Sequence, residues 1–170
     1  MSKKNFIIAL AFAGICAAVT LPTWAEETDT ALLAQSLSTV SVSLDQGLKA
    51  SKAQGKPISG KFELEHGAVQ LSVYVTKSGK FSEVIVDNKS GSIKKAETIT
   101  DSDDLKTANE QSQAITKAKV SLEKAVRDAV RAIPGYRAVR VMPTLNAGHP
   151  IAEITLMKGT EAKKVSKQLD

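Results

Sequence analysis

The chain has 170 residues, with 23 Lys and Arg against 18 Asp and Glu, one cysteine and 4% aromatic residues. This length can supply the core of one compact domain or of two small ones. The positive excess is mild and no basic stripe carries interleaved aromatic residues, which argues against a nucleic-acid-binding protein.

Residues 1–25 have the layout of a secretory signal peptide. Lys3 and Lys4 precede an apolar run over 6–19, and Thr23-Trp24-Ala25 supplies a small-x-small cleavage pattern. We therefore expect export and cleavage, giving a periplasmic or secreted protein.

This segment has two alternatives to a cleaved signal peptide. A membrane anchor is disfavoured because Gly14 interrupts the apolar run, which is shorter than the roughly 20 residues that cross a bilayer. A lipoprotein anchor at Cys16 would need a small residue where Ile15 stands. Cleavage also removes the one cysteine, so we expect no disulfide, thiol nucleophile or thiolate metal ligand in the mature chain.

The first half of the mature chain predicts a helix followed by antiparallel strands. After an N-terminal segment, 26–40, that could hold a short helix, Ser43 and Gln46 form a capping-box signature, and Gly55 and Pro57 end the helix that begins there. Alternating or turn-bounded stretches then predict strands at 62–65, 69–75, 81–86 and 92–98. Turns this short join antiparallel neighbours.

The second half predicts the same plan. Acidic residues over 101–104 favour a helix start, and helix-like sequence continues to Ile133, either as one helix or as two with a break near Val120-Ser121. Pro134-Gly135 ends it. Strands are predicted at 136–142, 151–157 and 162–169.

The two halves echo each other. Val42-Ser43-Leu44 recurs at Val120-Ser121-Leu122, an offset of 78 residues, and turn glycines recur near register. The sequence predicts an α+β fold with two tandem copies of a helix followed by an antiparallel β-meander, over 41–99 and 100–170.

Two motifs resemble the PepSY domain family. Pro134-Gly135 followed by a strand is similar to its helix-to-strand junction, and Asp87-x-x-x-Gly91 is similar to its strand-ending turn. The second copy stops at Asp170 before such a turn, and the first carries Gly55-Lys56-Pro57 in place of Pro-Gly. The resemblance spans roughly residues 40–170 and implies a binding role, including inhibition or chaperoning of peptidases, with Asp87, Gly91, Pro134 and Gly135 serving the backbone.

No catalytic site or cofactor is predicted. A hydrolase nucleophile usually needs a histidine base, and the chain has only His66 and His149, each beside a glycine at a predicted hairpin tip. Two exposed loop histidines without a role are one interpretation. The alternative is a metal- or cofactor-linked periplasmic accessory protein, in which a pseudo-twofold axis brings the two imidazoles together.

A basic set is the candidate partner-binding site, against the alternative of a solvated helix face. Its members are Lys124, Arg127, Arg131, Arg137 and Arg140. Antiparallel sheets can also accept an extended peptide as an added strand. The hypothesis is an exported, non-enzymatic protein that binds a protein or peptide in the cell envelope, inhibiting, chaperoning or regulating a peptidase or another envelope protein.

Overall fold

The computed structural model describes the backbone of residues 24–170 and the side chains from Thr30 onward. The predicted signal peptide therefore lies almost wholly outside the described residues. Within the described part of the chain, none of the helices has the length and apolar character needed to span a membrane.

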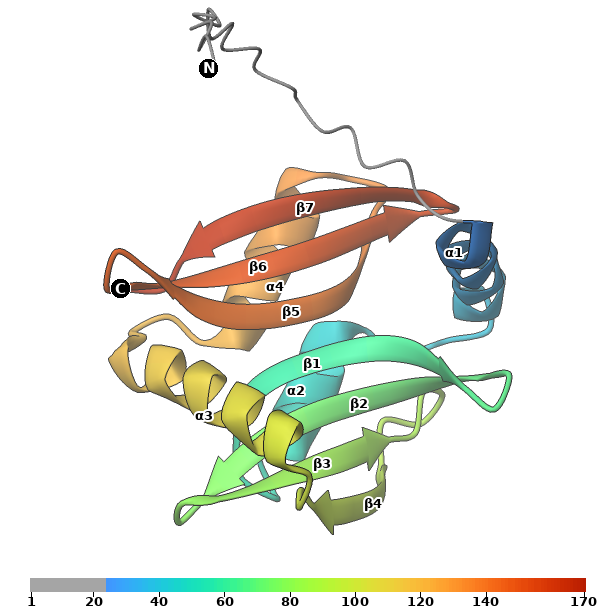
Figure 1. The fold of residues 1–170 in the computed structure, drawn as a ribbon. Helices are drawn as coiled ribbons and strands as arrows, with labels where there is room; N and C mark the ends of the chain where they lie inside the picture. Colours follow the sequence, from blue (N-terminus) through green and yellow to red (C-terminus); the bar gives the residue numbers. More distant parts are fainter. Residues whose placement is uncertain (1–23) are drawn as a thin grey trace, which may run out of the picture.

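Residues 24–170 form seven strands and four helices in an α+β arrangement (Figure 1). The seven strands make one antiparallel sheet in the order β4-β3-β2-β1-β5-β6-β7, so the two predicted meanders share a single sheet. The elements are α1 (Trp24–Leu37), α2 (Leu44–Ser51), β1 (Lys56–Glu65), β2 (Ala68–Lys77), β3 (Lys80–Val86), β4 (Ile93–Thr98), α3 (Ser102–Lys117), α4 (Leu122–Ala132), β5 (Arg137–Asn146), β6 (His149–Lys158) and β7 (Glu161–Gln168).

The order of elements approximately repeats. Two helices precede a four-stranded meander in the first half and a three-stranded meander in the second. The segment before α2 donates from the Ser41 and Val42 amides to the Asn88 carbonyl. The segment before α4 donates in the same way from Lys119 and Val120 to the Leu169 carbonyl. Each unit thus anchors its second helix to the backbone that follows its third strand.

Helices α3 and α4 are separate, which settles the question left open by the sequence. Ala118 leaves helical geometry, with ψ of 136°, and Ser121 starts α4 by accepting a hydrogen bond from the Lys124 amide. At the equivalent start of α2, the Ser43 amide donates to Gln46 Oε1 at 2.8 Å, as the capping signature predicts.

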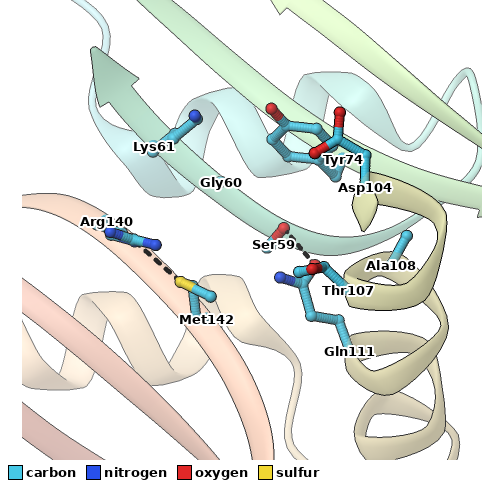
Figure 2. A pocket seen from close by; sticks show the side chains of 10 residues that line it. All are labelled: Ser59, Gly60, Lys61, Tyr74, Asp104, Thr107, Ala108, Gln111, Arg140 and Met142. Atoms are coloured by element: carbon cyan, nitrogen blue, oxygen red, sulfur yellow. Dashed lines mark hydrogen bonds between the residues drawn. The ribbon is translucent and has the colours of Figure 1, made fainter. Parts of the chain in front are cut away.

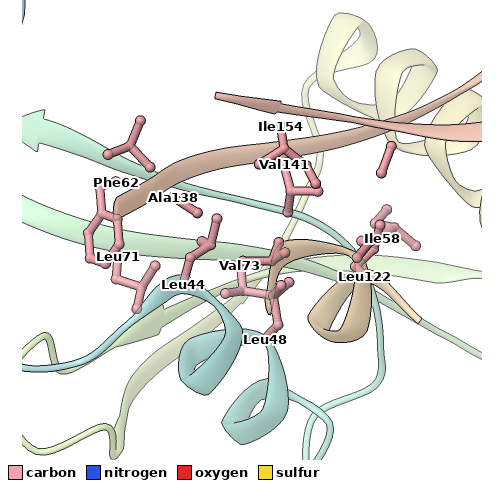
Figure 3. Close-up of a cluster of buried hydrophobic side chains, with 14 of the residues drawn as sticks. Leu44, Leu48, Ile58, Phe62, Leu71, Val73, Leu122, Ala138, Val141 and Ile154 are labelled. Carbon is pink, nitrogen blue, oxygen red and sulfur yellow. The ribbon is translucent and has the colours of Figure 1, made fainter. Parts of the chain in front are cut away.

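Helices α2 and α4 pack side by side on one face of the sheet, while α3 crosses the other face (Figure 1). Leu44 and Leu48 of α2 and Val126 of α4 are almost completely buried, together with Val73 and Ile154 from strands of different units. These side chains belong to one hydrophobic cluster that spans both units (Figure 3). Gly47 lets α2 approach the sheet, because a Cβ there would lie 2.5 Å from Leu71 Cδ2.

The units meet at a short seam between β1 and β5. Only Gly60 with Val141 and Lys61 with Arg140 are paired across it. Pairing with the outer neighbours is irregular near the seam, between Pro57 and Ser59 on β1 and between Ala138 and Arg140 on β5. The two strands therefore diverge on both sides of the seam (Figure 1).

Several strands are longer than the sequence predicts. β1 begins at Lys56 and includes Pro57, and β5 continues through Pro143 to Asn146. Both prolines lie outside the two positions at which β1 and β5 are paired. The missing proline N–H therefore removes no hydrogen bond between these two strands. The expected loop over 146–150 is reduced to a two-residue turn, Ala147-Gly148, with φ of 49° and 85°.

Candidate partner-binding site

An open groove of about 1250 Å³ lies where β1 and β5 diverge beyond Lys61 and Arg140. Gly60 faces α2, since a Cβ there would meet Leu44 and Leu48. Its neighbour Lys61, and Arg140 paired with it, therefore point to the opposite face. The groove is lined by Thr30 and Leu33 of α1, Lys61, Phe62, Glu63 and Leu64 of β1, Val139 and Arg140 of β5, Thr155 and Met157 of β6, and Thr160, Ala162 and Lys164 from the β6–β7 turn and β7.

The walls of the groove combine apolar side chains with strand edges. Phe62, Val139 and Met157 are each less than a tenth exposed and form its apolar part. Residues 62–65 of β1 pair with β2 on one side and have no registered partner on the side of β5. Alternate backbone N–H and C=O groups of this stretch therefore point into the space between the strands.

The charges of the groove are mostly cationic. Lys61 Nζ lies 2.5 Å from Glu63 Oε2, and the other oxygen of Glu63 accepts from Ser72 at 2.7 Å, so this acid is fully engaged. Arg140 Nε donates to Met142 Sδ at 2.9 Å, a weak acceptor. Among residues 30–170, no carboxylate forms an ion pair with Arg140 or Lys164. Within that part of the chain, the groove thus presents two cations, Arg140 and Lys164, without an ion-pair partner.

On the other side of the seam, α3 closes the space. A cavity of only about 180 Å³ remains there, sharing Lys61 and Arg140 with the groove (Figure 2). Buried Ser59 donates to Gln111 Oε1 of α3 at 2.7 Å, joining the helix to β1. Burial, with Glu83 and Glu63 nearby, raises the pKa of the Tyr74 phenol well above its usual range, so this hydroxyl keeps its proton. The groove beside α1 is consequently the open half of the seam.

The predicted basic set does not form one patch. Arg127, Arg131 and Arg137 line a separate pocket of about 400 Å³ between α2, α4 and the start of β5. Lys124 is outside this pocket and pairs with Asp128 at 2.5 Å. Arg140 lines the groove instead, and its pairing with Lys61 turns its side chain away from α2.

Arg137 also has a structural role that the sequence did not indicate. Its two terminal nitrogens donate to the carbonyl oxygens of Leu37 at 2.6 Å and Val40 at 2.7 Å, tying the α1–α2 connection to β5. Desolvation lowers the pKa of this guanidinium, which remains charged because arginine stays protonated in proteins. Its carbon Cζ lies 6.0 Å from the centre of the Phe62 ring.

The structure separates the two histidines. β1 and β5 are antiparallel at the seam, so the tips that follow them lie at opposite ends of the sheet, roughly 35 Å apart at about 3.3 Å per residue. His66 contacts Glu65 at 3.2 Å and His149 contacts Asp170 at 2.6 Å. From residue 30 onward, no group of three metal-ligating side chains is present. The pseudo-twofold axis therefore does not bring the imidazoles together.

The four residues of the family-like turns occupy backbone-determining positions. Asp87 Oδ1 accepts from the amides of Lys89 at 3.0 Å and Ser90 at 2.7 Å, and Gly91 has φ of 78°. Gly135, with φ of 85°, follows Pro134 between α4 and β5. Positive φ is the conformation that glycine adopts without strain.

Lys61 and Lys164 were not singled out by the sequence, because neither lies in a motif or a periodic face with Arg140. Only the long-range pairings of β1 with β5 and of β6 with β7 bring them to one groove. Comparisons of the chain with protein-family models, with curated proteins and with solved structures found no match.

Proposed function

We propose that this chain is an exported, non-catalytic protein that binds an extended, acidic segment of a protein partner in the groove between β1 and β5. The observation that carries the proposal is the groove itself. It combines an open strand edge, an apolar wall and two cations, Arg140 and Lys164, that form no ion pair with any carboxylate of residues 30–170.

The open edge of β1 supports strand addition. An extended peptide that pairs with 62–65 would satisfy backbone groups that β2 does not reach, over about 13 Å of strand. Main-chain hydrogen bonds supply affinity in this mode of recognition, and alternate side chains of the peptide enter flanking pockets. Phe62 and Met157 would receive apolar side chains of the segment.

The charges favour an acidic segment. Carboxylates at alternate positions of the peptide would meet Arg140 and Lys164, and the arginine can bind a carboxylate with two parallel hydrogen bonds. The same cations repel a basic segment, which gives the groove a basis for discrimination.

Sequence features define the compartment and class of the partner within this proposal. The signal-peptide layout of residues 1–25 makes the partner a periplasmic or secreted protein. The PepSY resemblance favours a peptidase, or another envelope protein, that is inhibited, chaperoned or regulated by the bound chain. The separation of the two histidines at opposite hairpin tips argues against the metal- or cofactor-linked alternative, which needs both imidazoles in one site.

The test uses a seven-residue peptide of alternating Glu and Val, its Lys and Val counterpart, and amide hydrogen exchange of the full mature chain. We expect the acidic peptide to protect those amides of 62–65 that point away from β2, and the basic peptide to give no protection. The double variant Arg140→Glu with Lys164→Glu should lose this protection, because it reverses the charge of the two cations that would meet the carboxylates of the peptide.

The matched control reverses two cations of the other face, Arg127→Glu with Arg131→Glu, and should bind the acidic peptide as the unmodified chain does. Equal protection in the two double variants would show that the groove is not the site. Protection by the basic peptide to the same extent would show that charge plays no part. A pull-down from the cell envelope with the same variants then identifies the natural partner.

A further inference from the structure

The second pocket lies on the face of the sheet that α2 and α4 cover, and it shares no lining residue with the groove. It has a volume of about 400 Å³, within the range of roughly 300–1,000 Å³ that is usual for small-molecule sites. Its walls come from three elements that the core fixes in place: the start of α2, one side of α4 and the residues that lead into β5.

The floor of this pocket is apolar. Leu44, Val126 and Ala138 are each at most 3% exposed, so their positions are set by the core. Val130 and Tyr136 complete the apolar part. Core packing fixes these side chains, so they cannot move to fill the pocket. An apolar group of a ligand can cover their exposed atoms, which is favourable because it removes apolar surface from water.

Three guanidinium groups stand around this floor. Arg127 has no ion-pair partner in the described part of the chain, and the one ion pair of Arg131 is a 3.8 Å contact with Asp128. Arg137 donates two of the five N–H groups of its guanidinium to backbone carbonyls. The one acid that lines the pocket is Asp45, whose Oδ1 accepts from the Ser43 hydroxyl at 2.6 Å.

We infer that this pocket binds a small carboxylate with an aromatic or branched aliphatic body. The carboxylate lies among the arginines, where planar bidentate hydrogen bonds are available, and the body packs on Leu44, Val126 and Tyr136. This inference is independent of the proposed peptide groove, because the two sites share no lining residue.

The test is a calorimetric titration of the full mature chain with 4-phenylbutyrate. Its neutral analogue 4-phenylbutyramide has the same body without the charge, and inorganic phosphate has charge without the body. We expect saturable binding of the carboxylate, binding at least tenfold weaker for the amide, and no saturable binding of phosphate. Chemical-shift changes should centre on α4 and the start of β5.

Two variants locate the site. Arg127→Gln with Arg131→Gln should weaken 4-phenylbutyrate binding at least tenfold, while Arg140→Gln with Lys164→Gln should leave it unchanged. Arg127→Lys with Arg131→Lys keeps the charge but removes the bidentate geometry. Its affinity for 4-phenylbutyrate should lie between the affinities of the other two double variants. Circular dichroism of each variant confirms that it folds.

Each contrary result overturns the inference. Equal affinity for the amide would show an apolar crevice without anion recognition, and equal affinity for phosphate would show a general anion surface. Unchanged binding in the Arg127 and Arg131 variant, or no saturable binding by the unmodified chain at millimolar concentration, would exclude the site. None of these results affects the acidic-peptide experiment, whose variants lie on the other face.

Discussion

Asp87 shows how one side chain holds a turn. Its carboxylate accepts from two backbone amides and from the Ser90 hydroxyl, and it pairs with Lys94 at 2.9 Å. The amide of Ser90, followed by Lys94 and the amide of Lys89, lowers the pKa of Asp87 far below its usual value. The folded chain therefore holds this proton less tightly than the unfolded chain, in which the pKa of an aspartate is about 3.9.

We predict that Asp87→Asn lowers the urea midpoint at pH 7, because the variant loses the charge that strengthens these hydrogen bonds. The stabilisation by Asp87 is complete above the unfolded pKa and is lost as the pH falls toward the folded pKa. The difference in midpoint between the two proteins should thus shrink below about pH 4. A difference that stays constant from pH 7 to pH 3 would show that the charge does not contribute.

Residues with local roles were predictable and residues with distant partners were not. Asp87 and Gly91 belong to a turn of five residues, so their spacing alone indicates the structure. Arg137 bonds to carbonyls about 100 residues earlier in the chain, and the sequence placed it with exposed arginines for that reason. Local spacing carries no information about such a contact.

At the scale of elements, one ion pair joins the equivalent helices of the two units. Lys52, at the end of α2, lies 2.5 Å from Glu123 Oε1 in the first turn of α4. The Glu123 side chain is only 7% exposed, while that of Lys52 is 55% exposed. Burial alone would raise the pKa of Glu123, but Lys52 and the Ser121 hydroxyl outweigh it and the pKa is lowered.

We predict that Lys52→Ala destabilises the fold by about 1–3 kcal/mol at pH 7, less than the roughly 3–5 kcal/mol of a fully buried pair because Lys52 is half exposed. Without Lys52, burial raises the pKa of Glu123, so the folded state binds the proton more tightly than the unfolded state. The stability of the variant should therefore increase as the pH falls from 7 toward 5, which urea unfolding at each pH measures.

The double variant Lys52→Ala with Glu123→Gln separates charge from packing. It should recover most of the lost stability, because the amide can be buried without an uncompensated charge. If the single and double variants are equally unstable at pH 7, lost packing of the lysine stem explains the effect instead.

Most elements could be predicted because their signals are local. Ser43 and Ser121 begin helices, and alternating residues identify the strands. The sequence pattern predicts β1 and β5 too short, because Pro57 and Pro143 stand inside them. Proline is tolerated there only because the two strands have already separated, a fact of tertiary structure.

At the scale of the molecule, the two units share one core. Ile154 of the second unit is completely buried in the same cluster as Val73 of the first. We predict that Ile154→Ala lowers the free energy of unfolding by about 2–5 kcal/mol. Amide protection measured by native-state hydrogen exchange should fall in β2 as much as in β6, because both strands become accessible through the same global unfolding.

Leu32→Ala provides the control for this experiment, since Leu32 is 48% exposed and its truncation should change stability by less than about 0.5 kcal/mol. Loss of protection confined to β6 would show that the units unfold separately, in spite of their common core.

The overall arrangement was only partly predictable. The echo between Val42 and Val120 indicated repeated units, but no local pattern specifies which strands meet between them. The groove depends on that meeting, since it exists because β1 and β5 pair at two positions and then diverge. The candidate site therefore follows from the topology, and the residues on its walls could not be grouped beforehand.

The short seam also determines how the molecule responds to mechanical force. α1 and β7 belong to different units, so tension applied at the two ends of the described chain loads the junction of β1 and β5. The sheet there has only two paired positions, against nine in the ladder between β5 and β6. Under tension, the hydrogen bonds between β1 and β5 in the middle of the sheet should break first. The packing of α2 against α4 would then be the main interaction that opposes separation of the two units.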